Sequence, residues 1–583
     1  MLGACAPAMQ GDAISPGPVA MDPSGPDPRV GLSAGWMDAG EAARHMRLVS
    51  NTPRPTGFFN PQNPGDFPFA NSDLAFQGDR VFIGSFNGFQ IYDVSNPASP
   101  SLVTTVQCPG GQGDLSVHGN LLFMSVEELS GRVDCGGQGV LLPVSPERFR
   151  GVRIFDISNI VQPRQVAAVQ TCRGSHTHTL VPDANDPSHV YIYVSGAALP
   201  RPADELPGCL RSGGETGVES PFFRIEVIQV PIANPQQARV VNAPRLFADP
   251  QTGDIAGLWQ GGRHGPGTQQ TAATDHCHDI TVYPAIGLGA GACSGNGILI
   301  DISNPASPVR IDEVVDPNFA YWHSATFNNA GTSVIYTDEW GGGTAARCRA
   351  SDPPTWGANA IFTLSERRLQ HAGYYKLSAP QTATENCVAH NGSLVPVPGR
   401  DIKVQAWYQG GVSVFDFTDP ANPREIAFFD RGPLSATNLM LGGFWSAYWH
   451  NGYIYGSEIA RGLDVLQLLP SEHLSQAEID AAKLVRFQDY NPQTQQRFAW
   501  PAHPVVAHAY LDQLQRNGGL TAARLSAVRS ELDRVERMTD ANQRRSGLTQ
   551  LATRLDADAS GARDADRVRA LASVVRELAG AAR

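Results

Sequence analysis

Segments in which apolar and polar residues alternate recur along the first 470 residues of the chain. In each segment an alternating strand ends at an aspartate, a turn that contains proline follows, and a second strand begins. Weaker copies occupy residues 223–241 and 360–377, and a truncated copy ends at Pro470. The clearest copies are "GFQIYDVSNPASPSLVTTV" (88–106), "GVRIFDISNIVQPRQVAAV" (151–169), "GNGILIDISNPASPVRIDEV" (295–314) and "GGVSVFDFTDPANPREIAFF" (410–429).

A second pair of strands precedes each copy, as in "SDLAFQGDRVFIGS" (72–85) and "HSATFNNAGTSVIYTD" (323–338). One repeat is therefore four antiparallel strands, and seven repeats fit an all-β, seven-bladed β-propeller over about residues 45–470. The last repeat has no fourth strand before Pro470. We predict that residues 46–51 supply this strand and close the ring, because closure removes exposed sheet edges.

The repeat motif "DVSNPASPSLV" (93–103) resembles the LVIVD-repeat proteins, a family of bacterial, mostly exported β-propellers. The similarity covers about residues 45–470. It implies the propeller fold and export. It implies no settled activity, so the function has to be inferred from the residues of the site.

The two ends of the chain differ from the repeats. Residues 504–583 are rich in Ala, Leu, Arg, Asp and Glu at helical spacing, which predicts a small C-terminal α-helical bundle after a linker with a short helix at 471–503. The mixed charges of the bundle favour a solvated face over a partner site. At the other end, Leu2-Gly3-Ala4-Cys5 resembles a bacterial lipobox, and the rest of 1–44 reads as a flexible tether. This pattern predicts lipidation of Cys5, and a chance match is the alternative.

The charge and hydropathy of the chain exclude two classes of partner. The 583 residues carry a formal net charge of −12 and contain no basic run, which argues against nucleic-acid binding. No apolar run is long enough to cross a bilayer. We therefore expect membrane contact only through a lipid anchor at Cys5, and an exported protein located in the periplasm or at the cell surface.

Eight cysteines remain when Cys5 is set aside. Half of them lie just before the first strand of a repeat and half lie after its second strand, and these positions share one face of an antiparallel blade. This register, together with export, predicts disulfides. A thiolate metal site is the competing interpretation, but the sequence has no Cys-x-x-Cys pair. The predicted bridges are Cys108–Cys135, Cys172–Cys209, Cys277–Cys293 and Cys348–Cys387.

Histidines and acids collect at the same face, where the innermost strands begin and the second strands end. Neutral imidazoles that converge on one axis suit Cu, Fe or Zn, and neighbouring carboxylates can orient the rings. Polar residues that line a wet channel, and Ca²⁺ bound by the acids, are the alternatives. The candidate metal ligands are His178, His278, His323 and His390, followed by His176 and His276. The carboxylates expected beside them are Asp279, Asp338, Glu339 and Glu458.

The strand register distinguishes these candidates. His178 and His323 occupy the repeat position of Asp73 and Asp114, whereas His278 is one residue away from it. Side chains alternate along a strand, so His278 could instead face a neighbouring blade and leave Asp279 inward.

Two functions remain open. The first is an exported, surface-anchored propeller that binds a transition metal and acts as a binding or interaction protein for an envelope protein or a small ligand. The second is a metal-dependent oxidoreductase that acts on a small molecule at the channel mouth. Five tryptophans could form an apolar pocket there, although packing between blades is the alternative use: Trp322, Trp340, Trp407, Trp445 and Trp449.

Overall fold

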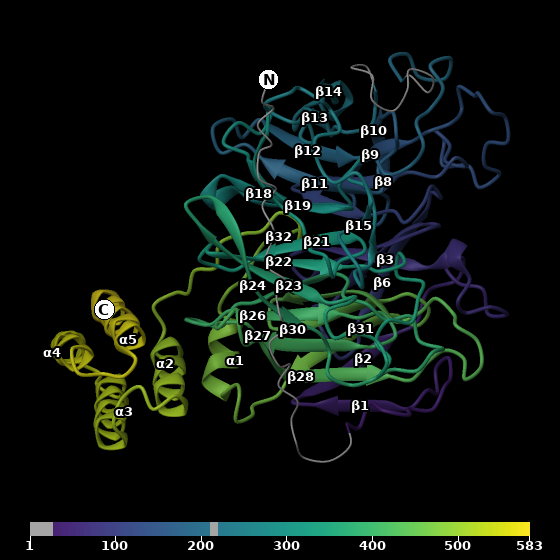
Figure 1. Cartoon of the computed structure of the whole chain (residues 1–583). Helices are drawn as coiled ribbons and strands as arrows, with labels where there is room; N and C mark the ends of the chain where they lie inside the picture. Colours follow the sequence, from purple (N-terminus) through teal and green to yellow (C-terminus); the bar gives the residue numbers. More distant parts are fainter. Residues whose placement is uncertain (1–26, 210–219, 583) are drawn as a thin grey trace, which may run out of the picture.

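A computed structural model describes residues 27–209 and 220–582. Seven antiparallel sheets form the blades of a β-propeller (Figure 1). Each innermost strand contacts the innermost strands of the neighbouring blades in a closed circuit. The predicted fold, a seven-bladed propeller followed by C-terminal helices, is therefore confirmed.

The strands of each blade follow one another outward from the channel. Blade 1 consists of β3 (Asn71–Gln77), β4 (Arg80–Ser85), β5 (Gly88–Asp93) and β6 (Ser101–Gln107), and blade 2 consists of β7 (Leu115–His118), β8 (Leu121–Val126), β9 (Gly151–Asp156) and β10 (Arg164–Gln170). Blade 3 consists of β11 (Thr177–Pro182), β12 (His189–Ser195), β13 (Glu226–Pro231) and β14 (Arg239–Asn242). Blade 4 consists of β17 (Asp279–Tyr283), β18 (Leu288–Cys293), β19 (Asn296–Asp301) and β20 (Val309–Val314). Blade 5 consists of β21 (Trp322–Phe327), β22 (Ser333–Asp338), β23 (Asn359–Ser365) and β24 (Arg368–Tyr375). Blade 6 consists of β25 (Gly392–Val395), β26 (Ile402–Ala406), β27 (Val412–Asp416) and β28 (Arg424–Arg431).

Blade 7 closes the ring with a strand from the beginning of the propeller. Its first three strands are β29 (Phe444–His450), β30 (Tyr453–Glu458) and β31 (Gly462–Leu468). The fourth is β2 (Met46–Thr52), which pairs antiparallel with β31. The predicted closure is confirmed. In addition, β1 (Glu41–Arg44) adds a fifth strand to blade 6, which we did not predict.

The recurring aspartate of the sequence motif has a local role in each turn. The side chains of Asp93, Asp156, Asp301 and Asp416 each accept a hydrogen bond of 2.9 Å from the backbone N–H two residues later. This arrangement is an Asx turn, which reverses the chain between the third and fourth strands. The motif therefore encodes turn geometry.

Both faces of every blade are buried against neighbouring blades. One core, for example, joins Val181 and Val227 of blade 3 to Ile280 and Ile300 of blade 4. The side chains of an innermost strand therefore alternate between the preceding and the following blade. This packing decides the orientation of several histidines.

Four disulfides staple the face at which the innermost strands begin. They join the four pairs that the repeat register predicts, with S–S distances of 2.00–2.06 Å: Cys108–Cys135, Cys172–Cys209, Cys277–Cys293 and Cys348–Cys387. Such bonds are typical of an extracellular or periplasmic protein. Cys5 lies outside the described residues.

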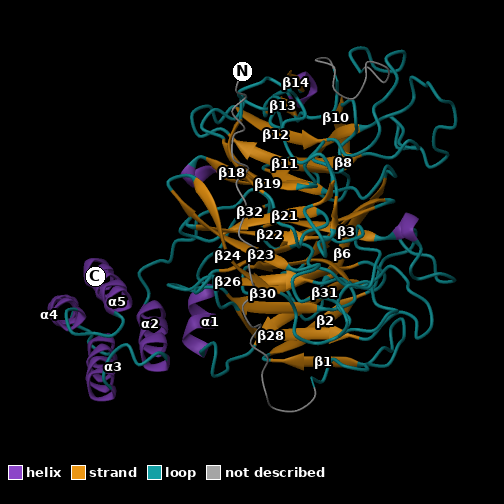
Figure 2. Ribbon diagram, in the orientation of Figure 1, coloured by secondary structure: helices purple, strands orange, loops and turns teal. Residues whose placement is uncertain are grey.

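The helices lie on one side of the propeller and the longest loops on the other (Figure 2). They are α1 (Gln476–Ala482), α2 (Pro504–Arg516), α3 (Ala522–Glu536), α4 (Ala541–Ala559) and α5 (Ala565–Ala581). The last four share a core of their own, whereas α1 packs on blades 6 and 7. Across the described residues, none of the helices is sufficiently long and apolar to cross a bilayer.

Residues 489–495, within the segment interpreted as a linker, run across the ends of the innermost strands. β32 (Asp489–Tyr490) pairs with β3, and the amide side chains of Asn491 and Gln495 bond to the backbones of β7 and β21. This segment covers the end of the channel that lies opposite the histidines.

Candidate metal centre

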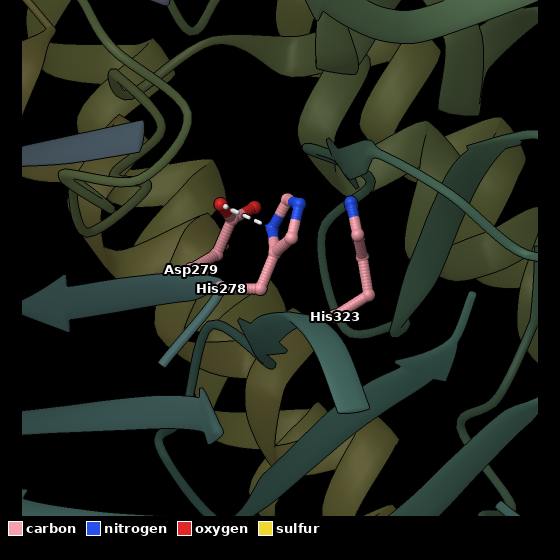
Figure 3. Close-up of side chains that lie close together, drawn as sticks. All are labelled: His278, Asp279 and His323. Carbon is pink, nitrogen blue, oxygen red and sulfur yellow. Dashed lines mark hydrogen bonds and ion pairs between the residues drawn. The ribbon is translucent and has the colours of Figure 1, made fainter. Parts of the chain in front are cut away.

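Four consecutive blades each contribute one imidazole to a row at the channel mouth. His176, His278 and His390 precede β11, β17 and β25, and His323 lies in β21. Successive ring centroids along the row His176, His278, His323, His390 are 4.4, 3.8 and 4.2 Å apart. Figure 3 shows the imidazoles of His278 and His323 side by side, with Asp279 beyond His278. The structure thus brings together three of the four leading candidates, together with His176.

Glu339 faces the last two imidazoles of the row. Its carboxylate oxygens lie 3.7 Å from Nε2 of His323 and 3.6 Å from Nε2 of His390. All three side chains are at most 7% exposed. Tyr408 donates a 2.6 Å hydrogen bond to the same carboxylate. His323, Glu339 and His390 could together hold an ion, and a second group that shares His323 with them, His278, Asp279 and His323, could also do so.

Two ring nitrogens lie near the carboxylate of Glu339, one with a lone pair and one without a hydrogen-bond partner in the described residues. Nδ1 of His390 donates to the backbone oxygen of Trp445, so Nε2 of the neutral ring carries a lone pair. Nε2 of His323 has no hydrogen-bond partner in the described part of the chain. Lone pairs and a carboxylate repel one another unless a proton or a cation lies between them. Burial raises the pKa of Glu339 to about 7, so this carboxyl competes for the proton near neutral pH.

The other half of the row is satisfied without an added ion. Nδ1 of His176 lies 2.7 Å from the carboxylate of Glu127, and its Nε2 lies 2.7 Å from Nε2 of His278. Burial favours neutral His176, but Glu127 outweighs it and the pKa of His176 is raised. When His176 is protonated, both of its nitrogens donate, and Nδ1 of His278 is left to donate to Asp279 at 3.1 Å. A metal bound at Nε2 of His278 would have to displace the proton that His176 donates to this nitrogen.

His178, which the register favoured, does not join the row. Its ring nitrogens lie 2.7 and 2.8 Å from the hydroxyls of Ser116 and Ser125, in the space between blades 2 and 3. The register of β11 is regular, so His178 faces blade 2 while its neighbours Thr177 and Thr179 face blade 4. His323 escapes this alternation because a bulge interrupts the ladder of β21 between Trp322 and Ala325, and bulges redirect side chains.

The burial of His178 leads to a prediction about acid stability. Burial lowers its pKa to about 3, below the 6.5 of an exposed imidazole. The unfolded chain therefore binds the proton more tightly, so stability is fully present above about pH 6.5 and is lost as the pH falls toward 3. Between pH 7 and pH 5 we expect protonation of His178 in the unfolded chain to lower the free energy of unfolding by about 2 kcal/mol. Urea unfolding at both pH values should show a smaller pH dependence in His178→Gln, and an unchanged dependence would contradict this role.

Three other candidates, His276, Asp338 and Glu458, make hydrogen bonds within loops and do not face the row of imidazoles. His276 lies 2.5 Å from Asp275 and 3.0 Å from the hydroxyl of Tyr321. Asp338 accepts backbone N–H groups of Ala320, Tyr321 and Gly357 at 2.8–3.0 Å. Glu458 accepts the backbone N–H of Gly443 and Ala460 and pairs with Arg461. Among the four predicted carboxylates, Asp279 and Glu339 face imidazoles.

Tyr408 was missed in the sequence although a signal was present. It follows the second strand of blade 6, the same part of a repeat that supplies Glu339 in blade 5. A third group with metal-binding residue types lies outside the channel, in the helical bundle, and consists of His508, Asp533 and Glu536. It is more exposed than the channel groups.

Comparison with known proteins supports the repeat assignment. The family model for the LVIVD repeat matches residues 70–108 and 292–316, which fall in blades 1 and 4. The protein is a seven-bladed β-propeller that contains LVIVD repeats. No curated protein sequence matches the chain.

Solved structures with similar architecture are distant. The periplasmic gluconolactonase of Pseudomonas aeruginosa shares 12% identity at a TM-score of 0.40, with 66% of this chain and 89% of that chain covered. A putative 6-phosphogluconolactonase from Bacteroides uniformis shares 10% identity at a TM-score of 0.39, with the same coverages of 66% and 89%. Similarity at this level carries no inference about activity.

Proposed function

We propose that the protein is an exported β-propeller that binds one transition-metal ion, Cu, Fe or Zn, at His323, His390 and Glu339, and acts as a binding or interaction protein. The observation that carries the proposal is the unpartnered, fully buried Nε2 of His323, which faces a carboxylate across 3.7 Å. Burial without a hydrogen bond is costly, and a bound ion would remove this cost.

The spacing of the ligand atoms supports the same proposal. Atoms bound to a tetrahedral ion at about 2.0–2.1 Å lie roughly 3.3–3.4 Å from one another. The two nitrogen-to-oxygen separations of 3.7 and 3.6 Å require only a small contraction to reach that geometry. Imidazole nitrogen favours these metals over Ca²⁺, which prefers oxygen ligands. The ring centroid of His278 lies 3.8 Å from that of His323, so His278 is the next candidate ligand once its hydrogen bonds are displaced.

Anchoring at the cell surface through Cys5 and a partner in the cell envelope belong to this proposal. The four disulfides support export. The net charge of −12 argues against a nucleic-acid partner. A metal-dependent oxidoreductase is the second candidate, because an apolar pocket adjoins the row of imidazoles at Tyr321.

Elemental analysis tests the metal proposal directly. We expect close to one equivalent of a transition metal in protein purified without chelator, and its loss from His323→Ala and His390→Ala, because each substitution removes a ligand. His189→Ala is the matched control, since this imidazole lies at the start of β12, beside Asp186 and away from the row, and its loss should leave the metal content unchanged. Wild-type protein that takes up no transition metal, even when metal is added during purification, would defeat the proposal.

A further inference from the structure

An apolar pocket of about 670 Å³ adjoins the row of imidazoles through Tyr321, whose ring centroid lies 5.9 Å from that of His278. One wall is the two-stranded hairpin of β15 (Gly262–Arg263) and β16 (Gln270–Thr271), which continues into Ala272 and Ala273. The hairpin is fastened to blade 5, because Ala272 donates its N–H to Ala320 at 3.0 Å. Tyr321 and Trp340 also line the pocket. The pocket is therefore part of the folded structure and does not depend on an isolated loop.

The indole of Trp340 offers a flat apolar surface. The guanidinium of Arg347 lies 3.3 Å from the centroid of the indole ring, which holds the ring in place. Gly262 and Gly342 border the pocket with positive φ angles of 110° and 61°, and a Cβ on either would meet nothing within 4 Å. Side chains there would occupy the free space. The absence of side chains at these positions leaves room for a planar ligand.

The four other tryptophans of the anticipated pocket have a different role. They are at most 8% exposed and belong to buried cores: Trp322, Trp407, Trp445 and Trp449. Trp340 is more exposed than these and lines the pocket. The apolar pocket anticipated from the tryptophans thus rests on a single indole.

One polar group links the pocket to the row of imidazoles. The hydroxyl of Tyr321 lies 3.0 Å from Nε2 of His276, and its ring centroid is 5.9 Å from that of His278. Trp340 directly follows Glu339 in the chain. A ligand in the pocket would therefore contact Tyr321 and Trp340. The Tyr321 hydroxyl donates to Nε2 of His276 and keeps a lone pair that can accept a hydrogen bond from the ligand.

We propose that this pocket binds a small aromatic molecule that carries one hydroxyl group, with its ring between Trp340 and the wall of Ala272 and Ala273 and its hydroxyl at Tyr321. Pockets of this kind bind mainly through apolar contact, and a few polar groups set the orientation of the ligand. The part of this inference that places the ligand beside a metal ion rests on the proposed function. Its binding to the pocket itself needs no metal.

The probes for the test are 4-methylphenol and toluene, and saturation-transfer NMR measures their binding. We expect wild-type protein to bind 4-methylphenol with a dissociation constant on the order of 1 mM, as suits a fragment of this size. Tyr321→Phe should weaken the binding of 4-methylphenol about two- to tenfold, the effect of one hydrogen bond, and leave that of toluene unchanged. Trp340→Ala should weaken both.

Filling the pocket gives the decisive variant. Ala273 is exposed, so Ala273→Trp should fold normally and reduce the binding of both probes at least about tenfold by occupying the space. Ala98→Trp, at an exposed turn of blade 1, is the matched control and should bind as wild type does. Equal binding by wild type and Ala273→Trp, or no binding by wild type, would overturn the inference.

The same measurement on His323→Ala separates the two proposals. We expect this variant to lose the metal and retain 4-methylphenol. Metal uptake without probe binding in wild type would overturn the pocket and leave the metal centre standing. Probe binding without metal uptake would overturn the metal centre and leave the pocket standing.

Discussion

Replacing Asp464 with Ala should lower the free energy of unfolding by about 3–5 kcal/mol. Asp464 is fully buried at the closure of the ring, where one carboxylate oxygen accepts from Arg431 at 2.6 Å and the other accepts from Asn51 of β2 at 2.6 Å. Arg431 also donates to Glu41 of β1 at 2.7 Å. Without Asp464 a guanidinium that is only 8% exposed loses its buried partner, while its bond to Glu41 remains.

Urea unfolding at pH 7 measures this effect. The double variant Arg431→Met with Asp464→Leu should recover much of the loss, because it leaves no buried charge unpaired. Arg164→Ala breaks an exposed ion pair with Asp156 and should cost less than about 1 kcal/mol. If Asp464→Ala stays within about 1 kcal/mol of wild type, this network does not hold the ring closed.

The fold was predictable because its signals are local and repeated. Alternating strands, proline-containing turns after an aspartate and the missing last strand predicted the number of blades and the closing segment, and the repeat register then paired the cysteines. β1 and the crossing segment 489–495 were not predictable in the same way. Each is short and is held by contacts to strands far away in the sequence, so neither has a periodic pattern.

The candidate site was predictable as a location and less so residue by residue. The face and the histidines near it follow from where the innermost strands begin. The orientation of His178 and His323 depends on whether a bulge interrupts the strand, and alignment of the repeats does not show this. Asp73, in another such bulge, accepts from Gln493 of the crossing segment at 2.9 Å, a contact that repeat alignment cannot supply.

Exchanging Asn491 and Gln495 together for Ala should lower the free energy of unfolding by about 2–4 kcal/mol. Each primary amide replaces a missing strand partner. Asn491 accepts from the N–H of Val117 and donates to its carbonyl, both at 2.8 Å, and Gln495 bonds in the same way to Phe327 at 3.0 and 2.9 Å. The double variant leaves four buried backbone groups without these partners, and water entering the channel end can replace only part of the loss.

Hydrogen exchange at Val117 and Phe327 reports this change at the atoms concerned. Both amides should exchange faster in the double variant, since their acceptors are removed, while amides in the outer strands should exchange as in wild type. Gln496→Ala is the matched control, because this amide bonds within its own segment to Asp489 at 2.7 Å. Unchanged protection of Val117 and Phe327 would mean that residues 489–495 cover the channel without sealing it. Faster exchange confined to these strand ends would show that the crossing segment completes the hydrogen bonding of the innermost strands.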